Sequence, residues 1–331
     1  MTQPPLKVAF WDYDRTAPLL DGRVRIEGRE TDITILRPQE TFVRAFGGAE
    51  FDICELSLSR HAQAVARGDD AYVGLPVFLS RAFRHGSIYV RGNGRRPADL
   101  RGSRIGLANF DDTAAVVVRA ILREHSVETN EVRWVLGDVE APARQAIAVP
   151  PLPGISLEAA PTGRFLDIML AEGELDALIS LNPPPSFRDG DGRVSRLFPD
   201  WPSAERDWFR SCGLFPVMHL VGIRRDVIER DPGIVEATYR AFAGARSIAM
   251  KNLTTMQAPK AMLPWIVAEL EATQALMGED FWAYGVEPNR GVLDWTLDQM
   301  RRDGLMARPI RTADLFHPII PESLHDATQL S

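Results

Sequence analysis

Three side chains that can carry positive charge interrupt an apolar segment in the first third of the chain. The stretch VFLSRAFRHGSIYV, residues 77–90, has apolar ends typical of buried strands, and Arg81, Arg84 and His85 lie between them. Charge beside a core is costly unless it is paired or faces a cleft. Alternate side chains of an extended segment share a face, so Arg81 and His85 are expected on one face and Arg84 on the other. The segment predicts either a ligand site or arginines paired with surface acids beside a half-buried histidine.

A second polar group follows the strand-like stretch FDICEL and precedes a helical pattern. It consists of Glu55, Ser57 and Ser59. Free backbone N–H groups at a helix start attract anions, which favours a ligand site here. An acidic residue near a helix start is also favoured by the helix dipole alone. Both interpretations of Glu55 stay open at this point.

Four further candidates lie at the ends of predicted elements or at a crossing between them. Arg15 follows the first strand, Thr113 opens a helix after two aspartates, Asn182 ends the strand DALISL, and His219 lies in the apolar run FPVMHLVGI. Each also has a simpler structural interpretation. Arg15 suits a surface ion pair, Asn182 suits the start of a proline loop, and His219 suits a core histidine with a backbone partner.

Strand-like and helix-like segments alternate through most of the chain and must position these residues. LKVAFW, TDITILRP and FDICEL are typical of strands, whereas QETFVRAFGGAE and LSRHAQAVARG are typical of helices. SRIGLANF, EVRWVLGD and DALISL continue the strand pattern, and the chain is mainly helical after LFPVMHLVGIRRDV. Such alternation indicates α/β layers with largely parallel sheets. The aromatic residues of the late helical region are expected in the core: Trp265, Phe281, Trp282 and Tyr284.

Two alternating blocks with two crossings, near residues 90–94 and 216–221, predict two α/β lobes. The first lobe is discontinuous and comprises residues 1–91 and 219–331, and the second comprises residues 92–218. Ligands of α/β folds bind at the carboxyl ends of strands. We therefore expect a ligand cleft between the lobes.

Composition excludes several classes of function. The chain has 331 residues and a formal net charge of -7, with no basic block, which disfavours a nucleic-acid partner. No apolar run approaches the length of a membrane span, so we expect no membrane partner. The start MTQPPLKVAFWDYDRT lacks an apolar signal core, which predicts a cytoplasmic location. The sequence leaves the oligomeric state open, a homo-oligomer included.

Cysteine and histidine spacing gives no metal motif. The two cysteines are far apart, and no two of the six histidines have the spacing of a helical metal pair. We therefore predict no metal site. The sequence also lacks a phosphate loop and a complete dinucleotide fingerprint, and we predict no cofactor.

Several motifs in order resemble the 4,5-dihydroxyphthalate decarboxylase family. They are DYDRT, FDICELSLS, PVFLSRAFRHGSIYV, DLRGSRIGLANFDDTAAV, AEGELDAL, GLFPVMHLVGIRRDV and YGVEPNR, and they span roughly residues 6 to 318. FRHGSIYV and FPVMH carry most of the specificity. The resemblance implies a two-lobed fold of the type 2 periplasmic-binding-protein class.

The resemblance also implies a reaction, the loss of CO2 from a hydroxylated aromatic dicarboxylate to give a protocatechuate-like product. Such chemistry needs an acid near the ring carbon, a base at the phenol, a clamp for the retained carboxylate and a water-poor site. The candidate proton-transfer groups are His85, His219 and Glu55, with the choice between the histidines open. The candidate binding residues share polar or cationic side chains: Arg81, Arg84, Arg15, Ser57, Ser59, Thr113 and Asn182.

Two other functions are compatible with this sequence. One is a solute-binding protein for a small carboxylate that serves a transporter or a sensor. The other is an enzyme of the same fold that acts on a different hydroxylated aromatic acid. The fold alone does not separate them, because one fold hosts unrelated functions. We expect the decarboxylase, a carboxy-lyase whose partner is a small aromatic carboxylate.

Overall fold

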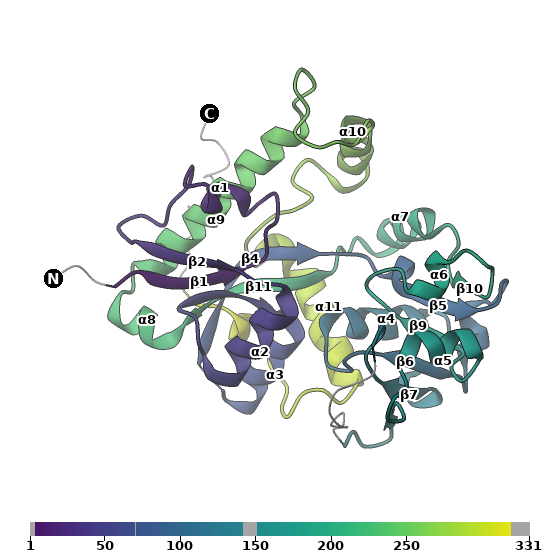
Figure 1. Cartoon of the computed structure of the whole chain (residues 1–331). Helices are drawn as coiled ribbons and strands as arrows, with labels where there is room; N and C mark the ends of the chain where they lie inside the picture. Colours follow the sequence, from purple (N-terminus) through teal and green to yellow (C-terminus); the bar gives the residue numbers. More distant parts are fainter. Residues whose placement is uncertain (1–3, 70, 142–150, 319–331) are drawn as a thin grey trace. The chain divides into compact units, whose positions relative to one another are not determined.

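The computed structural model describes residues 4–69, 71–141 and 151–318, which belong to two compact units (Figure 1). Unit 1 combines three segments of the chain: Met1–Arg81, Val217–Asp294 and Arg308–Ser331. Unit 2 combines two: Ala82–Pro216 and Trp295–Ala307. The predicted domains also include residues outside the described part, namely 1–3, 70, 142–150 and 319–331.

Two segments that the sequence pattern assigns to the first lobe belong to unit 2. Residues 82–91 do so because β5 (Ile88–Arg91) pairs antiparallel with β9 (Ala177–Ile179) and β10 (Val194–Arg196) of the second sheet. Residues 295–307 do so because they supply the buried Asp303 described below. The division near the first crossing therefore falls at residues 81/82 and not at 91/92.

Unit 1 contains a mixed five-stranded sheet. The strand order is β2 (Thr31–Ile35), β1 (Leu6–Phe10), β3 (Ile53–Ser57), β11 (Val217–Arg224) and β4 (Tyr72–Arg81). Strand β1 runs parallel to β2 and β3, whereas β11 lies antiparallel between β3 and β4. The expected largely parallel sheet is thus interrupted by a strand from much later in the chain.

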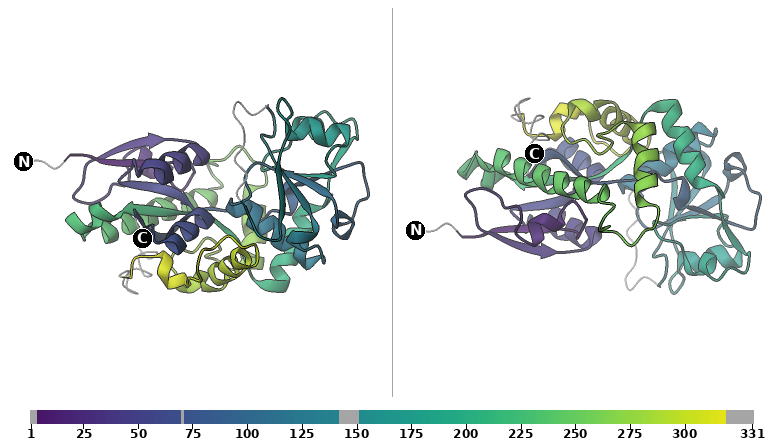
Figure 2. Two further views of the ribbon diagram at one scale, coloured as in Figure 1. Left: turned by 90° about the horizontal axis from the view of Figure 1, so that it is seen from below. Right: turned by 90° about the horizontal axis from the view of Figure 1, so that it is seen from above.

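Helices cover both faces of this sheet. Helices α2 (Pro38–Gly48) and α3 (Leu58–Arg67) lie on one face, and the long helix α9 (Ile234–Leu253) extends along the opposite face (Figures 1 and 2). The rings of Phe10 and Phe242 meet edge to face, 5.6 Å apart, which packs β1 against α9. The remaining helices that lie wholly in unit 1 are α1 (Ala17–Leu20), α8 (Arg225–Arg230) and α10 (Ile266–Met277).

The four aromatic residues expected in the core differ in their burial, and Phe281 and Trp282 are half-buried. Tyr284 is buried in unit 1, as predicted, but the side chain of Trp265, just before α10, is 73% exposed. Trp265 follows a loop that carries other exposed apolar side chains, Met262 and Leu263, so it has no core to enter. The prediction for Trp265 is therefore wrong.

Unit 2 contains a mixed six-stranded sheet in the order β10-β5-β9-β6-β7-β8. Its other strands are β6 (Arg104–Leu107), β7 (Arg133–Leu136) and β8 (Ser156–Ala159). Its helices are α4 (Thr113–Glu124), α5 (Leu166–Glu172), α6 (Pro185–Arg188) and α7 (Trp201–Cys212), together with most of α11 (Arg290–Arg302). The buried Trp134 lies in a core formed by both β-strand residues and α4.

A buried ionic cluster attaches the segment 295–307 to α4. The carboxylate of Asp303 is fully buried and accepts hydrogen bonds from Arg119 Nε at 2.7 Å and from Arg123 Nη1 at 2.6 Å. It also accepts a hydrogen bond from Thr129 Oγ1 at 2.8 Å. Burial raises the pKa of Asp303, but the two arginines outweigh burial and hold that pKa below its ordinary value. One carboxylate thus compensates two buried cations.

We predict that Asp303→Asn destabilises the protein by about 3–5 kcal/mol, because it leaves Arg119 and Arg123 buried without their negative charge. Urea unfolding measures the change. Asp298→Asn is the matched control, since Asp298 pairs with Arg301 on the surface and such pairs contribute about 1 kcal/mol or less. Equal effects of the two substitutions would contradict the stabilising role of the cluster.

Candidate active site

A carboxylate–imidazole pair joins neighbouring strands β3 and β11 of unit 1. Glu55 is in β3, and His219 is in β11, opposite Ser57 in the antiparallel register. His219 Nδ1 donates to Glu55 Oε1 at 2.6 Å, and Glu55 is fully buried. The two residues are 164 positions apart, so the insertion of β11 beside β3 creates the pair.

Two other groups from the loop after β1 bind the same carboxylate. The Trp11 backbone N–H donates to Glu55 Oε2 at 3.1 Å, and the Tyr13 hydroxyl donates to Oε1 at 2.7 Å. Burial and the charge of Glu55 raise the pKa of Tyr13, so its hydroxyl stays protonated and acts as a donor. Glu55 thus has donors at both oxygens and is directed toward His219.

His219 is the partly exposed member of this hydrogen-bonded group. Its side chain is 18% exposed, and its ring meets Phe42 edge to face at 4.9 Å. With Nδ1 bonded to Glu55, the nitrogen left for an exchangeable proton is Nε2. An imidazole oriented in this way by a carboxylate can act as a general acid or base.

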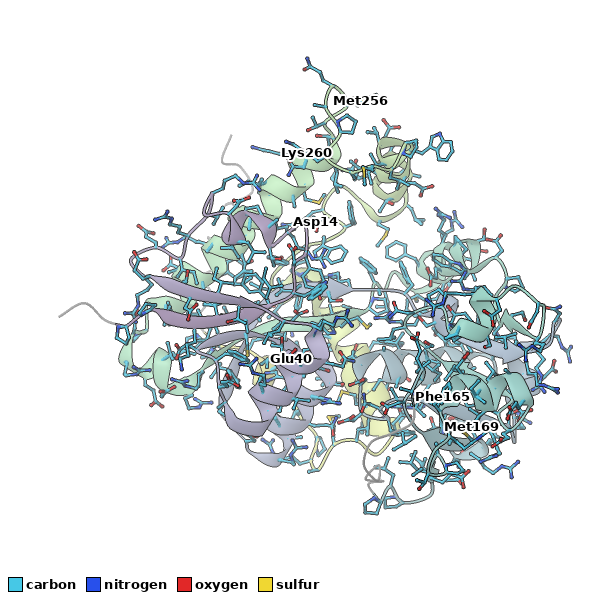
Figure 3. The ribbon with its side chains drawn as sticks, viewed as in Figure 1. Asp14, Glu40, Phe165, Met169, Met256 and Lys260 are labelled. Carbon is cyan, nitrogen blue, oxygen red and sulfur yellow. The ribbon has the colours of Figure 1, made fainter. Side chains whose placement is uncertain are left out.

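Arg15 lies between two aromatic rings beside the pair. Its guanidinium carbon is 4.1 Å from the centre of the Tyr13 ring and 4.4 Å from that of Trp282. Nε donates to the Leu79 carbonyl at 2.6 Å, and Nη1 pairs with Asp14 at 2.9 Å, in the loop after β1 (Figure 3). Arg15 therefore forms the ion pair that the sequence suggested, and its guanidinium also stacks between two aromatic rings.

Arg81 ends β4 and holds a later loop of unit 1. It donates to the Ala283 carbonyl at 3.0 Å and to the Asn289 side-chain carbonyl. Burial lowers the pKa of Arg81 to about 9. Arg81 therefore does not serve only to bind a ligand carboxylate, because part of its guanidinium binds other residues of the protein.

Arg84 and His85 belong to unit 2, whereas Arg81 belongs to unit 1, so the three candidate cations are divided between the units. Strand β4 stops at Arg81, and a 3-10 turn, η1 (His85–Ser87), follows, so the expected alternation of faces does not extend to His85. His85 is buried, and its ring packs edge to face on Phe198 at 5.1 Å.

His85 is not a cation near neutral pH. Burial, and then repulsion from His125, lower the pKa of His85 to about 4. Within the described part of the chain its Nδ1 is buried without a hydrogen-bond partner. The lowered pKa of His85 thus depends on tertiary packing and not on its position in the sequence.

Glu205 of α7 was not singled out by the sequence. It lies 3.4 Å from the Gly86 backbone N–H, which donates to it, and burial raises the pKa of Glu205 to about 7. A carboxyl group with this pKa exchanges a proton near neutral pH. No local signal marks Glu205, because its environment comes from the turn beside His85.

The other predicted binding residues are divided in the same way. In unit 1, Ser57 and Ser59 are buried, and their hydroxyl oxygens lie 3.3 Å apart. In unit 2, Thr113 is the buried first residue of α4, and Asn182 is exposed after β9. The structure therefore brings Glu55, His219, Ser57 and Ser59 together on β3, β11 and the start of α3.

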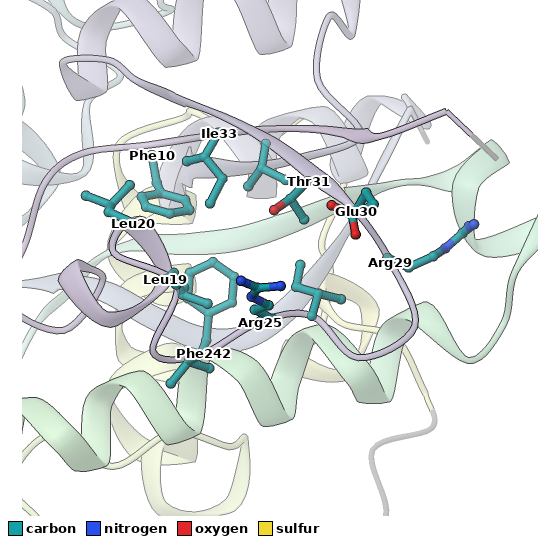
Figure 4. Close-up of a pocket in the computed structure, with 13 residues that line it drawn as sticks. Phe10, Leu19, Leu20, Arg25, Arg29, Glu30, Thr31, Ile33 and Phe242 are labelled. Carbon is teal, nitrogen blue, oxygen red and sulfur yellow. The ribbon is translucent and has the colours of Figure 1, made fainter. Parts of the chain in front are cut away.

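Two cavities in unit 1 are separate from these residues. One, of about 380 Å³, is bordered by β1, β2, α1 and α9 and includes Phe10, Arg25 and Phe242 (Figure 4). The other, of about 240 Å³, is lined in part by His61 and Tyr72. None of the predicted site residues lines either cavity, so neither cavity defines the candidate site.

The described residues contain neither a metal-binding cluster nor a membrane-spanning helix. In this part of the chain, no group of three or more histidine, cysteine, aspartate or glutamate side chains is arranged to hold a metal ion. Likewise, no helix in residues 4–69, 71–141 and 151–318 has the length and apolarity to span a membrane. A cytoplasmic location stays a prediction.

Solved structures with low sequence identity share the fold. The aliphatic sulphonate binding protein SsuA from Escherichia coli matches with a TM-score of 0.53 and 14% identity, over 96% of this chain and 92% of its own. The desulfurization enzyme DszB matches with a TM-score of 0.54 and 14% identity, over 98% and 99%. The chain has the periplasmic-binding-protein fold, as the sequence predicted, and this fold occurs in both a binding protein and an enzyme.

No family model matches the chain, but curated proteins do. A 4,5-dihydroxyphthalate decarboxylase from Comamonas testosteroni is 40% identical over 327 residues, which cover 98% of this chain and 99% of that protein. A protein of the same name from Pseudomonas putida is 42% identical over 215 residues, which cover 64% of this chain and 83% of that protein. The chain therefore belongs to the 4,5-dihydroxyphthalate decarboxylase family.

Proposed function

We propose that this chain is a carboxy-lyase that removes CO2 from a hydroxylated aromatic dicarboxylate, a 4,5-dihydroxyphthalate-like substrate, and releases a protocatechuate-like product. The observation that carries the proposal is the hydrogen bond between buried Glu55 and partly exposed His219, which leaves Nε2 of the imidazole available for proton transfer. Family membership supports the same substrate class.

The reaction requires only proton transfers and one carbon–carbon cleavage. A phenol para to the leaving carboxylate gives its proton to solvent, and the resulting electron density moves toward the ring carbon that bears this carboxylate. That carbon accepts a proton and the bond to the carboxylate breaks. CO2 leaves, the electron pair of the broken bond restores the aromatic ring, and the resulting phenolate takes a proton back from solvent. Positioned proton transfer contributes roughly 10²–10⁴-fold to such a rate.

We assign the proton transfer to the ring carbon to Nε2 of His219. Glu55 then acts through His219 and not on the phenol, because its oxygens already accept bonds from Trp11, Tyr13 and His219. Its hydrogen bond to Nδ1 fixes the orientation of the imidazole, so that Nε2 is the nitrogen that holds or transfers the proton. His85 is a poor candidate for this step, because the pKa of His85 near 4 leaves it neutral at the pH of the reaction.

We predict that His219→Gln lowers kcat for 4,5-dihydroxyphthalate by about 10²-fold or more, the scale of a lost acid or base. Glutamine retains hydrogen-bonding capacity and similar bulk, so the binding of the substrate should change much less. CO2 release and product formation measure turnover, and calorimetry measures binding. His125→Gln, at an exposed histidine, is the control. Wild-type protein that binds the substrate without releasing CO2 would instead support the solute-binding alternative.

We predict that His85→Gln leaves the pH dependence of kcat/KM unchanged between pH 5 and 8. Burial lowers the pKa of His85, so this histidine binds its proton only below about pH 4 and is neutral throughout that range. The comparison of the two pH profiles checks this directly. A limb of the profile that disappears in His85→Gln would contradict the assignment of proton transfer to His219.

We predict that activity survives removal of metal ions, because the proposed steps need no Lewis acid or redox centre. The protein is dialysed against a chelator, its metal content is measured, and CO2 release is assayed before and after treatment. Activity that is lost with the metal and returns when the same metal is added would contradict the prediction.

A further inference from the structure

A tyrosine hydroxyl is buried in unit 1 without a hydrogen-bond partner among the described residues. Tyr284 lies in the loop between α10 and η4 (Glu287–Asn289), and 4% of its surface is exposed. Leaving a buried donor unsatisfied costs about 1–3 kcal/mol. Buried polar groups of this kind are uncommon and indicate a missing partner such as water, an ion or a ligand.

Arg246 of α9 faces the same tyrosine. Its guanidinium carbon lies 5.3 Å from the centre of the Tyr284 ring, and 7% of the residue is exposed. Its terminal nitrogen pairs with Asp280, whose side chain is about half exposed. Within the described ranges, however, Arg246 Nε is buried without a hydrogen-bond partner. Two buried donors, an O–H and an N–H, are thus unsatisfied at one place.

A second buried arginine approaches from β4. Arg81 donates to the carbonyl of Ala283, the residue before Tyr284, at 3.0 Å. Burial lowers the pKa of Arg81, and repulsion from Arg246 lowers it further. Burial likewise lowers the pKa of Arg246. Two buried arginine side chains, Arg81 and Arg246, therefore lie near Tyr284 in a place where burial disfavours their charged forms.

The phenol stays a donor in this environment. Burial raises the pKa of Tyr284 to about 12, although Arg15, Arg246 and Arg81 act in the opposite direction. The phenol retains a proton to donate, and the Arg246 Nε–H can only donate. The missing partner must therefore be an acceptor, and the surrounding charge favours an anion.

We propose that Tyr284 and Arg246, with Arg81 beside them, bind a carboxylate group of the ligand. A planar carboxylate has two oxygens, so it can accept the Tyr284 O–H and the Arg246 Nε–H together. This inference rests on the proposed function, in which the aromatic ligand retains one carboxylate while the other leaves. Arg15 connects the two parts of the site, because its guanidinium stacks on both Tyr13 and Trp282.

The test measures binding and not turnover. Phthalate is the probe, because it has both carboxylates but lacks the para hydroxyl that the reaction needs. We expect Tyr284→Phe to weaken phthalate binding about tenfold or more by calorimetry, the usual size of a hydrogen bond to a charged group. Arg246→Lys should weaken it similarly, since lysine keeps the charge but lacks the planar fork. Tyr239→Phe, a neighbouring buried phenol on α9, is the matched control.

The melting temperature of the ligand-free protein separates this role from a structural one. Removal of an unsatisfied hydroxyl should leave the melting temperature of Tyr284→Phe equal to or above that of the wild type, whereas the stabilisation by phthalate should fall. Unchanged phthalate affinity in Tyr284→Phe would overturn the inference, as would a wild type that binds neither phthalate nor 4,5-dihydroxyphthalate. Phthalate binding that follows the expected pattern, together with no CO2 release from 4,5-dihydroxyphthalate, would contradict only the proposed reaction.

Discussion

A carboxylate that solvent does not reach imposes strict requirements on its surroundings. Glu55 is fully buried in the first sheet, and an unpaired charge in such a place would be far more costly than a hydrogen bond can offset. The loop after β1 therefore supplies a backbone N–H and the Tyr13 hydroxyl, and β11 supplies His219. The geometry of the site therefore depends on the local fold, because each donor is held in place by the element that carries it.

The position of β11 is the structural reason that these donors meet. A parallel α/β sheet would place consecutive strands and their loops at one edge, as the alternating pattern of the chain suggests. Instead, β11 enters antiparallel between β3 and β4 and aligns His219 with Ser57 on one side and Ser80 on the other. The pair thus depends on a contact between segments that are distant in the chain, and the same strand completes the sheet of unit 1.

The sequence predicted the fold class and several members of the site, but not their partners. Alternating patterns and family motifs identified the binding-protein fold, and Glu55 and His219 were both candidates. Their hydrogen bond was not predictable, because it requires the register of β11 against β3. The low pKa of His85 was not predictable either, because burial and then His125 lower it, and both come from tertiary packing. Tyr284 was correctly placed in the core, yet an aromatic residue in an apolar stretch gives no sign that its hydroxyl lacks a partner.

The buried Asp303 has a consequence for the order in which the protein can acquire its structure during synthesis. Ribosomes release Arg119 and Arg123 long before Asp303, and domains generally fold as units when their residues become available. Until residues 295–307 emerge, the middle segment of the chain contains two arginines whose buried counter-charge does not yet exist. The sheet of unit 1 likewise cannot be completed until β11 has been synthesised. Neither unit can therefore complete its native structure early, because unit 1 requires β11 and unit 2 requires Asp303, which follows α11.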